Sequence, residues 1–208
     1  MRTSDNGFAL DGKRARMKAA NRQAILDAAR LVFARMGYNA TNVRDIIRET
    51  QLAAGTFYNY FKSKEEVFEA LASSSAERFR PHLKTVREES GSFEDFIRGA
   101  YRAYFQFVKD ENADPVPTGV PNVALFGVRA DTPEMQAVFE EIRTYIEAML
   151  VDVPALDIDT EYLTAAAIGI ARDLGDHMLQ RNPVDVDGTT EFAANLFLTG
   201  IMGVLSQD

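Results

Sequence analysis

The sequence has no cysteine and no tryptophan, and its two histidines, His82 and His177, lie far apart. Without cysteine there is no disulfide framework or thiolate zinc site, and two distant histidines do not indicate a metal cluster. The longest nearly apolar stretches, residues 163–171 and 196–205, are far shorter than the roughly 20 residues that cross a bilayer. Residues 1–16 lack the apolar segment of a secretion signal. We therefore expect a soluble, cytoplasmic protein with no metal, cofactor or membrane partner.

The charge of the chain is divided unevenly along its length. The formal net charge is −8, but residues 1–80 contain 14 basic and 9 acidic side chains, whereas residues 81–208 contain 9 and 22. The two parts therefore carry +5 and −13, and residues 13–64 alone carry 11 basic against 3 acidic side chains, or +8. A basic N-terminal module on an acidic body is expected when only one end approaches phosphates.

Helical periodicity extends along most of the chain, and no segment shows a convincing strand alternation, so the pattern predicts an all-α fold. In the basic module Asn42 is placed to cap a short second helix, and Ser63 with Glu66 has the spacing of a capping box. Gly37 is a natural helix stop. The helices expected there are residues 18–36, 43–49, 52–61 and a fourth from residue 63.

The acidic body is also expected to be helical. Ser92 precedes one helical pattern, and Thr132 followed by Pro133 opens another. The last two helices are apolar almost all round, so each must be covered on more than one side. The helices expected in the body are residues 93–109, 122–129, 133–149, 159–180 and 189–206.

Two short helices joined by a tight turn on a basic module fit a helix-turn-helix, whose second helix enters the major groove of DNA. Residues 37–47, GYNATNVRDII, and residues 55–68, GTFYNYFKSKEEVF, closely resemble the signature of the TetR family of bacterial transcriptional regulators. The resemblance implies a three-helix DNA-binding domain, and behind it a helical domain that binds an effector and dimerises. We expect these domains at 18–62 and 63–208, after a flexible basic arm at 1–17.

The family pattern also assigns roles to residues of the module. It implies that Phe57 and Phe61 anchor the small core, that Gly55 lets DNA approach closely, and that Lys64 holds a phosphate. An ordinary core cluster is the alternative explanation of the aromatic run 57–61. The residues expected to face DNA are Asn42, Arg44, Gln51, Ala53, Ala54, Gly55, Thr56, Tyr58, Asn59, Tyr60 and Lys64.

Three residues before Gly55 and Thr56 depart from the family pattern, namely Gln51, Ala53 and Ala54. Ala53 cannot cap a helix, and Ala53 and Ala54 can touch thymine methyl groups but cannot donate hydrogen bonds to guanine. We therefore expect few direct hydrogen bonds to bases. Sequence specificity would depend more on Arg44, Gln51, Asn59, methyl contacts and DNA shape. The N-terminal cations are either a solvated tail or an arm that touches DNA; they are Lys13, Arg14, Arg16, Lys18 and Arg22.

In the body, the resemblance implies an apolar effector pocket with a few polar groups. Its candidates are Tyr104, Phe105, Phe126, Tyr145, Arg172, Asp173 and His177. The alternative is that Asp173 and His177 form an ordinary structural pair, or Arg172 and Asp176 a surface pair. Small residues in the last two helices permit close helix approach, as in a two-fold four-helix bundle. The dimer candidates are Ala166, Gly169, Phe197, Gly200, Ile201 and Val204.

Together these features predict a homodimeric, ligand-responsive transcriptional regulator and not an enzyme. It is expected to be a repressor that a small, largely apolar effector releases from a palindromic double-stranded DNA operator. One alternative is an all-helical enzyme that uses Asp173 and His177 as an acid–base pair. The other is an architectural DNA-binding protein without an effector.

Overall fold

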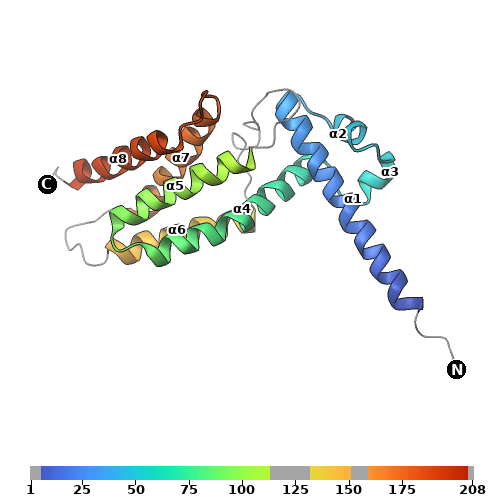
Figure 1. The fold of residues 1–208 in the computed structure, drawn as a ribbon, viewed down its shortest axis with the longest axis horizontal. Coiled ribbons are helices and arrows are strands. Elements are labelled where there is room, and N and C mark those ends of the chain that lie inside the picture. Colours follow the sequence, from blue (N-terminus) through green and yellow to red (C-terminus); the bar gives the residue numbers. More distant parts are fainter. Residues whose placement is uncertain (1–5, 113–131, 151–158, 206–208) are drawn as a thin grey trace.

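The computed structural model describes residues 6–112, 132–150 and 159–205, and all regular elements in these ranges are α-helices (Figure 1). The expected all-α fold is confirmed. The expected helix at 122–129, including Phe126, lies outside the described residues. The helices are α1 (Asn6–Met36), α2 (Val43–Thr50), α3 (Ala54–Tyr58), α4 (Lys64–Glu89), α5 (Phe93–Glu111), α6 (Pro133–Leu150), α7 (Thr160–Leu179) and α8 (Val186–Leu205).

Local capping signals decide where most helices start. Asn42 Oδ1 accepts from the Asp45 amide at 3.2 Å while Asp45 Oδ2 accepts from the Asn42 amide at 3.0 Å, a reciprocal box that opens α2. Ser63 caps α4 through the Glu66 amide at 3.3 Å. In a full capping box the Glu66 side chain would accept from the amide of the cap residue, Ser63. Here Glu66 Oε2 instead accepts from the Lys62 amide at 2.8 Å.

The N-terminus differs from the expected flexible arm at 1–17. α1 begins at Asn6, and continues without a break to Met36 over 31 residues. Residues 13–24 contain no glycine or proline and consist largely of alanine, lysine, arginine and glutamine, which favour a helix. Gly37, with φ 79°, ends the helix, and its amide donates to the Phe33 carbonyl at 2.8 Å.

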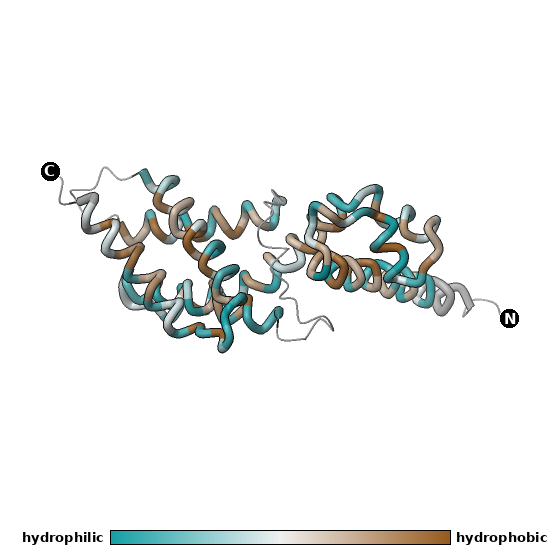
Figure 2. The backbone as a smooth tube through the Cα atoms, turned by 90° about the horizontal axis from the view of Figure 1, so that it is seen from above, coloured by the Kyte–Doolittle hydropathy of each residue, from teal (hydrophilic) through white to brown (hydrophobic). Residues whose placement is uncertain are grey.

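The helices enclose two separate apolar cores, visible as brown segments at the two ends of the molecule in Figure 2. α1, α2 and α3 surround the first core, and α5 to α8 surround the second. α4 belongs to both: Val67, Phe68 and Leu71 are buried in the first, and Phe79 and Leu83 in the second. Figure 1 shows α4 running between the two parts of the molecule. α4 is therefore a single continuous helix that both cores share.

The body is a helical bundle in which α5 packs against α4, α7 and α8, while α6 packs against α4 and α7. Arg78 on α4 pairs with Glu111 at the end of α5, and Arg80 pairs with Glu141 on α6. Within the described residues, no helix is both long and apolar enough to span a membrane.

Candidate nucleic-acid interface

The turn between α2 and α3 is set by one residue in the left-handed region. Gln51 ends α2 with φ 58° and ψ 11°, the only positive φ of a non-glycine residue in the described part of the chain. The Thr50 hydroxyl accepts from the Leu52 amide at 3.1 Å and closes the same turn. These contacts make the tight turn that joins the two helices of a helix-turn-helix.

The residues of α3 divide between core and surface. Phe57 is fully buried and Phe61 is 5% exposed in the first core, which confirms both as anchors. Tyr58 is 55% exposed on the opposite side, next to exposed Asn59. Thr56 and Tyr60 are half-buried at the border between the two. The aromatic run is therefore partly core and partly surface, and its exposed part is polar.

The start of α3 is exposed, and no side chain caps it. Ala53 occupies the N-cap with φ −63° and ψ 144°, and no side chain caps the helix. Ala53, Ala54 and Gly55 are all exposed, and no atom lies within 4 Å of the position that a Cβ of Gly55 would take. The chain itself does not require glycine here, so the missing side chain leaves room for a partner outside the protein.

The polar candidates of α2 lie at both ends of that helix. Asn42, Arg44 and Gln51 are exposed, and Asn42 is also held by its capping box. Arg48 pairs weakly with Asp45 at 3.7 Å, whereas no carboxylate lies within ion-pair distance of Arg44 among the described side chains. Of the two arginines on α2, Arg44 is therefore the one whose guanidinium is available to bind a phosphate or a base edge.

Lys64 is the first residue of α4, as expected, and it has contacts within the protein. Its Nζ donates to the carbonyls of Tyr38 and Thr41 at 2.9 Å each and of Asn39 at 3.4 Å. The same ammonium lies 4.5 Å from the centre of the Tyr38 ring. All three N–H donors of the ammonium therefore bond within the protein. These hydrogen bonds connect the first turn of α4 to the link between α1 and α2.

Tyr38 completes this junction. Its ring packs on Phe33 and Phe68, with centroids 5.4 and 4.9 Å away, and its hydroxyl donates to Glu65 Oε1 at 3.3 Å. Burial, and next the Glu65 carboxylate, raise the pKa of Tyr38 above its usual value. Sequence patterns missed this role of Tyr38 and Lys64, because the two residues are 26 positions apart.

The predicted effector residues that the structure describes lie on α5, α6 and α7 in different surroundings. Tyr104 and Phe105 lie together on α5, with ring centroids 5.8 Å apart, and Phe105 is fully buried in the second core. Arg172 Nε donates to exposed Asp173 at 3.2 Å, so Asp173 pairs with Arg172 instead of His177. Exposed His177 has no hydrogen bond to either residue among the described side chains.

Asp176 is the acidic side chain of α7 that points inward. Its Oδ1 is shielded from solvent and has no hydrogen-bond partner among the described residues. Desolvation, and next the Asp173 charge, raise the pKa of Asp176 to about 6. Burial also raises the pKa of Tyr104, with Asp176 as the next cause, so the two side chains lie close enough to interact. Sequence spacing alone could not tell Asp176 from its exposed neighbour Asp173.

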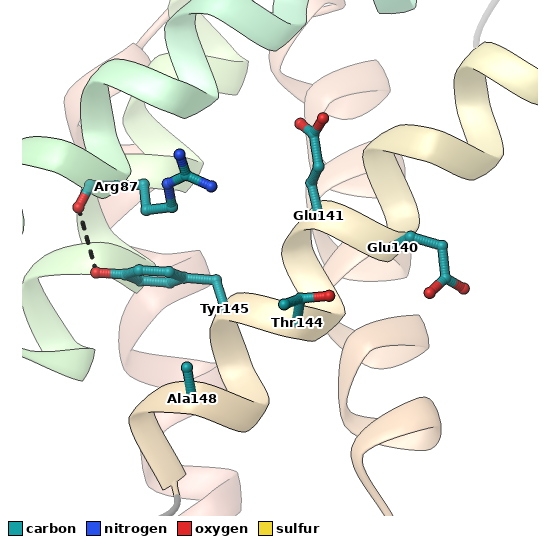
Figure 3. Close-up of a pocket in the computed structure, with 6 residues that line it drawn as sticks. All are labelled: Arg87, Glu140, Glu141, Thr144, Tyr145 and Ala148. Atoms are coloured by element: carbon teal, nitrogen blue, oxygen red, sulfur yellow. Dashed lines mark hydrogen bonds between the residues drawn. The ribbon is translucent and has the colours of Figure 1, made fainter.

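Two open grooves lie between α4 and α6. One has a volume of about 250 Å³ and is lined by Arg87, Glu140, Glu141, Thr144, Tyr145 and Ala148 (Figure 3). The other, of about 510 Å³, shares Arg87, Glu141 and Tyr145 and reaches Phe96 at its floor. The Tyr145 hydroxyl donates to the Arg87 carbonyl at 3.3 Å, as the dashed line in Figure 3 shows. Of the predicted effector residues, only Tyr145 lines a described groove.

The expected dimer residues are also divided. Phe197 and Ile201 are 4% and 8% exposed, because they pack into the second core of their own chain. Ala166 and Gly200 are exposed, and Gly169 has open space beside it. The side chain of Val204 lies outside the described residues. The exposed large apolar side chains on α7 and α8 are instead Tyr162, Phe192 and Leu196, at 77%, 61% and 52%.

Comparison with known proteins agrees with the arrangement of the module. Residues 25–71 match the family model for bacterial regulatory proteins of the tetR family. The chain is 28% identical over 98 residues to the transcriptional repressor KstR2 of Mycolicibacterium smegmatis, covering 47% of this chain and 48% of that protein. It is 28% identical over 93 residues to the transcriptional regulator YhgD of Bacillus subtilis, covering 45% and 49%. The chain thus spans about half the length of these two curated relatives.

A longer match is to the transcriptional regulator TcmR of Streptomyces glaucescens, 25% identical over 178 residues, 84% of this chain and 76% of that one. Among solved structures, a TetR-family regulator of Syntrophomonas wolfei covers 91% of this chain and 99% of its own, with a TM-score of 0.69 and 16% identity. The fatty acid degradation regulator FadR of Bacillus halodurans covers 85% and 94%, with a TM-score of 0.66 and 18% identity. The resemblance to the TetR family and the expected two-part fold are confirmed.

Proposed function

Because residues 25–71 carry the N-terminal module of the TetR family, we propose that this protein is a transcriptional regulator that binds double-stranded DNA. The observation that carries the proposal is the exposed tip of α3. Gly55 leaves open space there, and Tyr58 and Asn59 point away from the core. A helix end with this shape fits the major groove, where phosphate contacts fix orientation and base contacts select sequence.

The contacts at this tip divide by chemistry. Arg44 and Tyr58 would hold phosphates, and Asn59 and Gln51 would read base edges. The methyl groups of the alanines would meet thymine methyls. Lys64 would act indirectly, since its ammonium donates to three carbonyls and connects the start of α4 to the link between α1 and α2.

We also infer that the regulator works as a homodimer. A palindromic operator presents two half-sites about 34 to 36 Å or a multiple of that distance apart, and one reading helix spans only one of them. α7 and α8 carry exposed apolar side chains, Tyr162, Phe192 and Leu196, which a second copy would cover. Phe192 and Leu196 are four positions apart and therefore share one face of α8.

The proposed mode of control is repression relieved by a small, largely apolar effector in the cytoplasm. α4 contributes to both apolar cores, so an effector that prefers one position of α4 also selects one position of the reading head. Asp176 is a candidate polar group to orient such a ligand. Its Oδ1 is shielded from solvent, has no hydrogen-bond partner among the described residues, and lies close enough to Tyr104 to interact with it.

The test of DNA binding uses genomic fragments and purified protein in a mobility-shift assay. We expect Tyr58→Ala to weaken binding to many fragments by roughly 10-fold, and Asn59→Ala to change which fragments bind best. Phe139→Ala is the control, because Phe139 is an exposed aromatic residue on α6, away from the module. Binding that is identical for the wild type and both α3 variants would rule out this face of the protein.

A further inference from the structure

α1 extends well beyond the module that it supports. Its residues in the first core begin at Ile25, whereas the helix begins at Asn6. Residues 12–20 are all exposed, and Figure 1 shows this part of α1 projecting past α3 without another helix beside it. At a rise of about 1.5 Å per residue, the stretch from residue 12 to residue 24 is roughly 18 Å long.

The buried face of α1 continues into this projection as a row of cations. Lys18, Arg22, Ile25 and Ala29 follow the spacing i, i+4, i+7 and i+11, so they share one face of the helix. Arg14 lies four residues before Lys18 on the same face. Ile25 and Ala29 are fully buried against the module, but the cations lie where the module has ended. We call Arg14, Lys18 and Arg22 the basic stripe.

The basic stripe begins beside the segment that links α3 to α4. The guanidinium carbon of Arg22 lies 5.4 Å from the centre of the Phe61 ring, and Phe61 lies three residues after Tyr58, the last residue of α3. From there Lys18 and Arg14 extend the row by about 6 Å per step along the helix. The stripe therefore runs from the link between α3 and α4 along the projecting part of α1.

No acidic side chain that the structure describes pairs with the basic stripe. Among the described side chains, no carboxylate lies within 4.0 Å of Arg14, Lys18 or Arg22. Like charges four residues apart on a helix repel by about 0.2–0.5 kcal/mol per pair. This arrangement is unfavourable in the isolated chain, and a polyanion beside it would make it favourable.

We propose that the basic stripe is a second DNA-binding surface, which holds the phosphate backbone beside the groove that α3 enters. The inference rests on the proposed function. Arginine and lysine on a straight helix make contacts to phosphates that are independent of sequence, so the stripe adds affinity and orientation but no base specificity. The segment acts as a rigid helical extension, because it is continuous with α1.

The test is the salt dependence of DNA binding by the full chain. The double variant Arg14→Gln/Lys18→Gln removes two cations and spares Arg22, which also contacts Phe61. Binding to a random-sequence duplex of about 30 base pairs is measured from about 50 to 200 mM salt. We expect the slope of log affinity against log salt to become shallower by about 2, and affinity near 100 mM to fall roughly 10-fold.

The matched control is Lys13→Gln/Arg16→Gln, which removes the same charge from the opposite face of the same helical segment. It is expected to change the slope by less than half as much. The swap Arg14→Lys/Lys18→Arg keeps the charge and should keep the wild-type slope. Circular dichroism checks that each variant keeps its helix content.

The outcomes separate the two proposals. If the wild type binds DNA but the stripe and control variants behave alike, the stripe is not a DNA surface, although the proposed function stands. The same conclusion follows if the stripe variant loses binding only to vesicles of anionic phospholipid. If the wild type binds neither genomic fragments nor the random duplex, the proposed function itself has failed and the inference fails with it.

Discussion

Gly55 has no reason within its own chain to be glycine. It lies in α3 without a positive φ, and the space where its Cβ would sit is open. Glycine in a helix costs about 0.5–1 kcal/mol relative to alanine, so the chain carries an unfavourable residue that its fold does not need. Close approach of DNA would explain that cost.

Gly55→Ala should therefore separate stability from binding. We expect the free energy of unfolding to rise by roughly 0.5–1 kcal/mol, measured by urea titration. Affinity for bound genomic fragments should fall by about 10-fold, because the added methyl group meets the DNA. Gly12→Ala is the control, since Gly12 is also in a helix with open space around it. If Gly55→Ala binds DNA as tightly as the wild type, DNA does not approach Gly55 closely.

Asp176 is a second residue whose environment has a measurable effect. Its pKa is raised to about 6 by desolvation, so the folded protein holds a proton that the unfolded chain releases near pH 4. The resulting stability is complete below about pH 4 and is lost as the pH rises through about 6. At neutral pH the charged carboxylate is unfavourable, although solvent screens a side chain that is only partly buried.

Asp176→Asn should accordingly stabilise the protein at pH 7.5 and not at pH 4. After solvent screening, we expect the free energy of unfolding at pH 7.5 to rise by on the order of 1 kcal/mol. The thermal midpoint of the variant should also change less between the two pH values than that of the wild type. The control is Asp173→Asn, because Asp173 is exposed and pairs with Arg172 at the surface. If the two variants show the same pH profile, the buried position of Asp176 has no energetic consequence.

Lys64 acts at the scale of elements, because its three hydrogen bonds connect the start of α4 to the link between α1 and α2. A lysine that held a phosphate would be exposed and would contribute little to folding. A lysine that satisfies three carbonyls contributes to stability, because its removal leaves those groups without their charged donor.

Lys64→Met keeps the length of the side chain and removes the ammonium. We expect the module to lose about 1.5–3 kcal/mol, seen as a lower urea midpoint, while the salt slope of DNA binding stays unchanged under conditions where the protein is folded. Lys62→Met is the comparison, since Lys62 is an exposed cation two residues away. A shallower salt slope with unchanged stability would instead support direct phosphate contact by Lys64.

The elements that could be predicted from sequence are those specified by neighbouring residues. Asn42, Ser63 and Ser92 each cap a helix at the expected position, because a cap depends on residues two or three positions away. The start of α1 was missed, since cationic residues there resemble a solvated tail as much as a helix face.

Contacts between distant residues could not be predicted. α8 is apolar almost all round, so its sequence did not show that Phe197 and Ile201 face the chain's own core while Phe192 and Leu196 face outward. The choice between Asp173 and Asp176 likewise depends on α5, which lies far away in sequence. Of the candidate site, the split between Phe57 and Tyr58 followed from the family pattern, but the partners of Lys64 required the fold.

On the scale of the whole molecule, α4 joins a basic module to an acidic body, and the outward face of α8 offers a surface for a second copy. Phe192 and Leu196 lie on that face at 61% and 52% exposure. Two charges placed there would have to be desolvated in a dimer but would stay hydrated in a monomer.

Phe192→Glu/Leu196→Glu should therefore convert a dimer to a monomer in sedimentation experiments and keep the helix content. DNA affinity should drop by at least about 100-fold, because one reading head alone engages one half-site. Phe139→Glu is the control, as Phe139 is a partly exposed aromatic residue on α6. A double variant that remains dimeric would move the interface to another face.

Reading of DNA by two copies of the exposed tip of α3 is the central part of the proposed function. Sequencing the genomic fragments retained by the purified wild-type protein tests this directly. We expect enrichment of an inverted repeat whose half-sites are centred about 34 to 36 Å, or a multiple of that distance, apart, and loss of the enrichment with Tyr58→Ala. Fragments without a shared sequence, or a shared sequence that Tyr58→Ala still selects, would contradict it.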